Sequence, residues 1–152
     1  MSKGFLSLIL HAHLPFVRHP EHSFSLEEKW YFEALTECYL PLLEVLNRLE
    51  QDKIDYRLTI SISPTLAAMW QDYYLQEKYR SYLLRLLDLA DKEVKRTAGD
   101  PNFSPLAQHY QQRFQSAYHN YFEHYRCDLI NAFRQLAQKG KLELITCAAT
   151  HG

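Results

Sequence analysis

Three short apolar segments, separated by long helical patterns, divide the chain. Phe5–Leu10 (FLSLIL) is a short and bounded apolar run, which is typical of a strand buried in a parallel sheet. Arg57–Ile62 alternates in polarity and is rich in β-branched residues, so it predicts a second strand. Leu142–Cys147 predicts a third strand. The chain therefore begins and ends on predicted strands.

The segment between the first two strands has the period of an amphipathic helix. Its apolar residues recur every three to four positions to about residue 50. Ser25 and Glu28 have the spacing of a capping box at its start. Pro41 lies inside the pattern and lacks the N–H that a helix uses, so we expect a kink or break there. We expect the acidic residues to form a solvated face: Glu27, Glu28, Glu33, Glu37, Glu44 and Asp52.

A long helical region follows the second strand directly. Ser63 and Pro64 supply an N-cap and a proline at the first helical position. The pattern continues over residues 64–98, with a break expected near Tyr74. Gly99-Asp100-Pro101 is a strong stop and turn signal.

A second long helical pattern covers residues 105–138, and Gly140 is a candidate C-cap. The resulting order predicts an α/β fold with parallel strands and a long helical insertion between strands 2 and 3. A closed parallel barrel typically needs about 250 residues. We therefore expect this chain of 152 residues to be one partial barrel domain, residues 1–152, that ends after its third strand.

Composition and charge limit the kinds of partner that this chain is expected to bind. The 17 basic and 18 acidic side chains nearly cancel, which gives no electrostatic reason to expect nucleic acid or an anionic membrane as a partner. No apolar run approaches the roughly 20 residues that span a bilayer. Cys38, Cys127 and Cys147 form no CxxC pair, so neither a zinc knuckle nor a disulfide framework is predicted. We expect a cytoplasmic protein; nothing in the sequence indicates its oligomeric state.

Histidines near two predicted strand ends are the main candidates for chemistry. His11 and His13 are two residues apart, so in a strand they would project to the same side. His151 follows the third strand and would reach the same mouth of a parallel sheet, where α/β folds place their sites. The alternative is that one histidine of the first pair is an ordinary surface residue.

The remaining polar candidates are weaker. The hydroxyls of Ser61, Ser63 and Thr65 could line the same cleft, but N-capping explains Ser63 fully. Glu143 lies within the third strand and could face either side, so no carboxylate pair for glycoside hydrolysis is visible. Five further histidines are expected to be structural or exposed: His19, His22, His109, His119 and His124.

Two sequence strings resemble signatures of glycoside hydrolase family 57. Residues 11–20 (HAHLPFVRHP) are similar to the first signature of its branching-enzyme group, HxHxPYVRxP. Residues 144–152 (LITCAATHG) are similar to the start of the second, and residues 61–66 (SISPTL) resemble the S-P-T-L turn of the family. The resemblance covers nearly the whole chain.

This resemblance implies an incomplete barrel of seven parallel strands and helices, followed by a helical domain. It also implies retaining chemistry on α-1,4-glucans, with a glutamate nucleophile, an aspartate acid/base and no cofactor or metal. In the branching group, a glucan 6-hydroxyl replaces water and creates an α-1,6 branch. His11, His13 and His151 match family histidines that line the donor-sugar subsite. The two carboxylates would lie in later signatures beyond Gly152, so we expect the chain alone to be inactive.

Three alternatives stay open. The same family includes α-amylases and 4-α-glucanotransferases, which act on the same polymers. A metal-dependent hydrolase barrel can also begin with an HxH pair that binds zinc, and stoichiometric zinc on His11 and His13 would favour it. A non-enzymatic helical interaction module is the third alternative, since an open sheet leaves apolar strand edges exposed.

Overall fold

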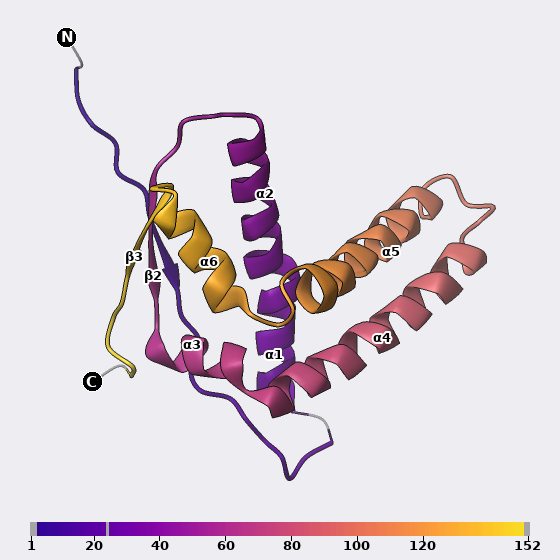
Figure 1. The fold of residues 1–152 in the computed structure, drawn as a ribbon. Coiled ribbons are helices and arrows are strands. Elements are labelled where there is room, and N and C mark those ends of the chain that lie inside the picture. The colour runs from indigo at the N-terminus through magenta and orange to yellow at the C-terminus, as the bar shows by residue number, and fades with distance from the viewer. Residues whose placement is uncertain (1–2, 24, 151–152) are drawn as a thin grey trace.

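Three parallel strands form one sheet in the order β1-β2-β3 (Figure 1), in a computed structural model that describes residues 3–23 and 25–150. Strand β1 is Ile9–Ala12, β2 is Leu58–Ile62 and β3 is Leu142–Ile145. Both pairings are parallel, as the sequence predicts. The three strands thus have their carboxyl ends at the same edge of the sheet.

Strand β1 lies further along the chain than predicted. The predicted segment starts at Phe5, whose side chain is 100% exposed, whereas pairing with β2 begins with Ile9 opposite Thr59. The β2 partner strand is too short to pair with the first apolar residues, so apolar character alone placed the strand wrongly. As a result His11 lies within β1, and His13 directly follows the last residue of that strand.

The break expected at Pro41 is absent, because the chain stays helical through this residue, and a wider π-helical turn lies just before it. Helix α1 (Leu26–Ala34) runs into the π-helix η1 (Leu35–Tyr39), which runs into α2 (Leu40–Gln51). Pro41 has no N–H to donate to the Glu37 carbonyl four residues earlier. Instead, Arg113 from a distant helix donates to the Glu37 carbonyl oxygen at 3.4 Å.

The first long helical pattern after β2 divides at Asp72. Helix α3 (Pro64–Gln71) ends there, and α4 (Tyr73–Arg96) begins with the Asp72 carboxylate accepting from the Leu75 N–H at 3.1 Å. The break lies two residues before Tyr74, where the sequence predicts one. Ser63 caps α3 as predicted, accepting from the Leu66 N–H at 3.3 Å.

The second long pattern is not the single helix that its apolar spacing predicts. It forms α5 (Ser104–Tyr118), the π-helix η2 (His119–His124) and, after a turn, α6 (Leu129–Gln138). Arg126 and Cys127 have φ angles of 51° and 62°, in the left-handed region that ends helices. The prediction of continuous helix over residues 105–138 is therefore wrong at residues 125–128, where the chain leaves the helix between η2 and α6.

Gly140 ends α6, as the sequence predicts. Its φ is 69°, a left-handed conformation that glycine adopts without steric cost. The N–H of Gly140 donates to the Ala137 carbonyl at 2.9 Å, and the N–H of Lys141 donates to the Leu136 carbonyl at 3.0 Å. These two bonds make a Schellman motif with Gly140 one position beyond the cap, and they turn the chain directly into β3.

The core lies between one face of the sheet and the helices, while α4 and α5 form a hairpin that extends away from the sheet (Figure 1). Aromatic rings fill much of it, as in the stacked pair Trp70 and Phe133 and the edge-to-face pair Tyr79 and Tyr121. Burial raises the pKa of Tyr39 to about 12, so this core ring stays neutral at ordinary pH. Among the described residues, the helices are all too short or too polar to cross a bilayer.

Candidate functional site

The side chains of the sheet face that no helix covers include two of the three predicted histidines, His11 and His13. His11 pairs with Ser61, and Ser61 pairs with Ile145 on the far strand, so these three residues form one row across the sheet. Because side chains alternate along a strand, His13 and Cys147 follow two positions later towards the same face. The carboxyl end of this open face is where the predicted chemistry should lie.

The two imidazoles lie together, as predicted. The rings of His11 and His13 are parallel to within 6°, with centroids 5.7 Å apart. His11 is exposed and His13 is half-buried, so the pair borders solvent. The third predicted histidine, His151, lies outside the described residues.

Cys147 reaches the histidine pair, a feature that sequence reasoning missed. The ligand atoms of His11, His13 and Cys147 all lie within 4.8 Å of one another. The thiol comes from the segment after β3, the same segment that was expected to deliver a histidine. Its two-residue spacing from Ile145 was the available signal, but only the strand register shows that it points to the histidines.

The hydroxyl groups near the turn after β2 have structural partners. Ser63 caps α3 and its hydroxyl also lies 3.0 Å from that of Thr65. Thr65 donates to the Leu14 carbonyl at 2.7 Å, which ties the loop after β1 to the start of α3. Ser61 lies in the central strand β2 and is buried. N-capping, the preferred interpretation of Ser63, is confirmed.

One carboxylate shares the open face with the histidines. Glu143 lies in the row Ile9, Thr59, Glu143, two residues below His11, and accepts from the Thr59 hydroxyl at 2.9 Å. The sequence alone did not show which face of the sheet the Glu143 side chain occupies, and the strand register places it on the open face. A second carboxylate from the described residues is absent from these rows, so the paired acids of a glycosidase are not assembled by the sheet residues described here.

A buried ion pair anchors the loop that follows β1. Glu28 is only 1% exposed, and its carboxylate accepts from the His19 N–H at 2.8 Å and from the Lys78 ammonium at 2.6 Å. Lys78 also donates to the His22 carbonyl at 2.7 Å. The prediction of a solvated Glu28 is therefore wrong. Only half of the capping box is formed. The Ser25 hydroxyl accepts from the Glu28 N–H at 3.4 Å, while the Glu28 carboxylate accepts from the His19 N–H in the loop.

Further bonds hold the same loop against α3 and α4. Arg18 pairs with Asp72 at 2.9 Å, which joins the loop to the break between the two helices. The Tyr74 hydroxyl donates to the His19 carbonyl at 3.0 Å. With Thr65 on Leu14, these contacts fix the course of the backbone that leaves the histidine pair.

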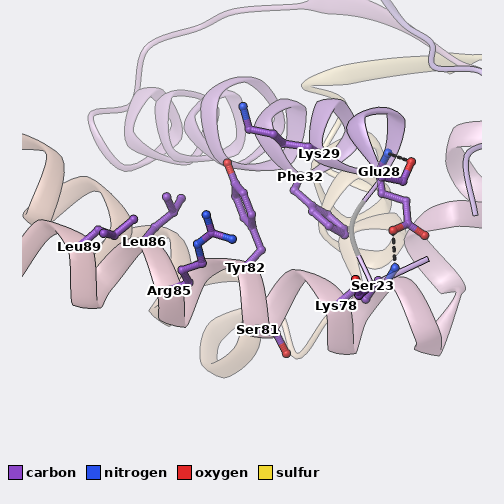
Figure 2. Close-up of a pocket in the computed structure, with 11 residues that line it drawn as sticks. Ser23, Glu28, Lys29, Phe32, Lys78, Ser81, Tyr82, Arg85, Leu86 and Leu89 are labelled. Carbon is purple, nitrogen blue, oxygen red and sulfur yellow. Dashed lines mark hydrogen bonds and ion pairs between the residues drawn. The ribbon is translucent and has the colours of Figure 1, made fainter. Parts of the chain in front are cut away.

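A separate cleft of about 270 Å³ lies between α1 and α4 (Figure 2). The Glu28–Lys78 pair closes one end of it, and Phe32 and Tyr82 form part of its wall. Its lining includes no sheet residue and no carboxylate other than the already paired Glu28. This cleft is therefore distinct from the histidine face and lacks the acids for glycoside chemistry.

The five remaining histidines lie away from the strand ends. His19 and His22 are in the anchored loop, with ring centroids 6.3 Å apart. His119 in η2 lies 2.7 Å from Glu123, a pairing across one helical turn. His109 and His124 belong to α5 and η2. These positions agree with the structural or exposed roles expected of them.

The sequence model of glycosyl hydrolase family 57 matches residues 7–152, which is almost the whole chain. The chain belongs to this family. The resemblance that rests on the two histidine-bearing strings is thereby confirmed, and the structure places the first string at the end of β1 and the described residues 144–150 of the second at the end of β3.

Related proteins carry the family's activities. The 1,4-alpha-glucan branching enzyme of Thermococcus kodakarensis is 33% identical over 99% of the chain, which covers 22% of that enzyme. A probable 1,4-alpha-glucan branching enzyme of Mycobacterium tuberculosis is 32% identical over 47% of the chain and 13% of its own length. The chain thus spans about a fifth of the Thermococcus sequence.

Solved structures of family members share the fold. A branching enzyme from Pyrococcus horikoshii aligns with a TM-score of 0.90 and 32% identity over 99% of the chain and 28% of its own. An alpha-amylase from Thermotoga maritima aligns with a TM-score of 0.88 and 42% identity over 95% of the chain and 27% of its own. The arrangement of three parallel strands and helices is therefore that of family 57 enzymes.

Proposed function

We propose that this chain forms the first part of the catalytic (β/α)7 barrel of a retaining α-glucan enzyme, whose activity is 1,4-alpha-glucan branching. The observation that carries the proposal is the parallel histidine pair at the carboxyl end of β1, on the sheet face that no helix covers. In parallel barrels that face is the interior, and its carboxyl end is the site of chemistry.

His11 and His13 are proposed to bind the donor sugar together with His151. Imidazole nitrogens donate and accept hydrogen bonds, so a stacked pair offers several polar atoms to neighbouring sugar hydroxyls. Such bonds accelerate the reaction when they strengthen in the transition state. A structure of the Thermococcus relative was determined in complex with glucose, which is consistent with a sugar subsite in this family.

The two catalytic carboxylates are proposed to come from residues outside this chain. The nucleophile and the acid/base must lie about 5 Å apart across the sugar in a retaining enzyme. The face that carries the histidines presents only Glu143 among the described rows of the sheet, and that carboxylate already accepts from Thr59. We therefore expect the 152 residues alone to turn over no glucan.

α-Amylase activity is the second candidate, because the Thermotoga alpha-amylase is 42% identical to this chain. Both activities would begin with the same covalent glycosyl-enzyme. They would differ in whether water or a glucan 6-hydroxyl resolves that intermediate. Products distinguish them, since hydrolysis releases reducing ends and branching conserves their number.

A chimera tests the proposal. Residues 1–152 replace the aligned segment of the Thermococcus branching enzyme, and amylose is the substrate. We expect α-1,6 branches, and we expect His11→Ala or His13→Ala to lower kcat/KM by about 100-fold, as lost transition-state hydrogen bonds do. His109→Ala, on helix α5, is the matched control and should leave the rate unchanged.

Each outcome of this experiment bears on a separate part of the proposal. Full activity in both strand-end variants would overturn the sugar-binding role of the two histidines. New reducing ends without branches would favour the amylase. Branching by the 152-residue chain by itself would contradict the placement of the catalytic carboxylates elsewhere.

A further inference from the structure

We propose that His11, His13 and Cys147 also form a binding site for one divalent transition-metal cation of the zinc type. Their three ligand atoms lie within 4.8 Å of one another at the carboxyl end of the sheet. The proposed sugar-binding role uses only the histidines and assigns no function to the Cys147 thiol.

The donor set fits zinc chemistry. Neutral imidazole nitrogen and thiolate sulfur are the ligands that zinc takes in proteins, with bonds of about 2.0 Å to nitrogen and 2.3 Å to sulfur. Hard cations such as calcium and magnesium prefer oxygen and would be rejected. The two imidazoles and one thiol therefore select a borderline or soft metal.

The geometry requires only local adjustment. Donor atoms around a tetrahedral zinc are separated by roughly 3.3–3.7 Å, which follows from those bond lengths. The present separations are at most 4.8 Å, so the donor atoms must approach one another by no more than about 1.1–1.5 Å. His11 is exposed, and Cys147 lies beyond the last paired residue of β3, so both side chains have room to rotate inwards.

The backbone beneath the site is held in place. His11 is paired with Ser61 within the sheet, and the loop after His13 is tied through Leu14 to Thr65. On the other strand, the Thr146 hydroxyl donates to the Ile62 carbonyl at 3.3 Å, next to Cys147. Pre-positioned ligands lower the ordering cost of binding a metal.

Binding should release a proton and depend on pH. The Cys147 thiol must lose its proton to the solvent as the sulfur–metal bond forms, and both imidazoles must be neutral. Affinity should therefore fall as the pH is lowered, because protons compete with the metal for its imidazole and thiolate ligands. Three protein ligands leave a fourth position for water or an exogenous ligand.

The metal and the sugar would compete for the same imidazoles. A metal held by His11 and His13 occupies the nitrogen atoms that the proposed function gives to sugar hydroxyls. This consequence rests on the proposed function, whereas metal binding itself does not. Metal titration of the chain without any glucan therefore tests metal binding independently of the proposed function.

Cobalt and zinc titrations of the reduced 152-residue chain test the site. We expect one Co²⁺ per chain with thiolate-to-cobalt charge-transfer absorption, which Zn²⁺ displaces. Calorimetry in two buffers of different ionisation enthalpy should show the released proton. Cys147→Ser should abolish the charge-transfer absorption, and His11→Ala should weaken zinc binding by about 100-fold.

Matched variants keep the test specific. Cys38→Ser removes an exposed thiol on η1, and His22→Ala removes an exposed imidazole in the anchored loop. Both should bind as the unaltered chain does, and circular dichroism should show the same fold for all variants. Charge-transfer absorption that survives Cys147→Ser, or no bound metal at micromolar concentration, would overturn the proposal. Loss of metal binding in Cys147→Ser, with unchanged branching by the chimera that carries the same substitution, would support the metal site independently of the proposed function.

Discussion

The two faces of the sheet are built from alternate residues of the same three strands, yet they have opposite characters. On the covered face, Ala12, Ile60 and Leu142 are buried against helices. On the open face, His11 and Ile145 border solvent. A shift of one residue in pairing would exchange the two sets, so a single register both forms the core and brings the histidines together.

Replacing one isoleucine by alanine on each face of the sheet tests this difference in burial. Ile60 is 1% exposed and Ile145 is 42% exposed. Ile60→Ala should lower the free energy of unfolding by about 3 kcal/mol, because it removes buried methyl groups and leaves a cavity. Ile145→Ala should cost less than about 1 kcal/mol. Urea unfolding followed by circular dichroism measures both, and equal losses would contradict the division into a covered and an open face.

A smaller effect is expected where the helical layer holds the loop of the open face. Lys78→Ala would leave the Glu28 carboxylate buried without its cation and should cost about 2 kcal/mol, which is below the roughly 3–5 kcal/mol of fully buried pairs because Lys78 keeps some exposure. Lys92→Ala, which breaks an exposed pair with Asp88, is the control and should change stability little. Urea unfolding followed by circular dichroism measures both changes in stability. A loss in Lys92→Ala as large as that in Lys78→Ala would rule out the anchoring role of Lys78.

The smallest expected effect distinguishes two buried tyrosines. The Tyr79 hydroxyl lies 2.9 Å from that of Thr36, whereas the Tyr121 hydroxyl has no hydrogen-bond partner among the described residues. Tyr79→Phe should therefore lose about 1 kcal/mol. Tyr121→Phe removes an unsatisfied buried group and should gain up to about 1 kcal/mol. Thermal unfolding compares them, and destabilisation by Tyr121→Phe would point to a partner for that hydroxyl.

Local signals in the sequence predicted much of the fold. Ser63 caps a helix and Gly140 ends one, because each acts through bonds to backbone groups a few residues away. The second strand and the parallel pairing were also predicted. The break at residues 125–128 was missed because the apolar spacing continues through the π-helix before it and hides the turn.

Features that depend on contacts between residues far apart in the sequence could not be predicted from the sequence alone. Glu28 is buried because Lys78, fifty residues later, neutralises it. Strand β1 begins at Ile9 because its partner strand is short. For the candidate site, the histidine pair was predicted from its spacing, but Cys147 joined it only through the register of a third strand.

The anchoring of the loop after β1 has a consequence for substitutions within it. Tyr74 and Lys78 hold this loop through the carbonyl oxygens of His19 and His22, and Glu28 holds it through the His19 N–H. These are main-chain atoms that nearly every amino acid provides. Substitutions at positions 19 and 22 should therefore leave the path of the polypeptide after the histidine pair unchanged.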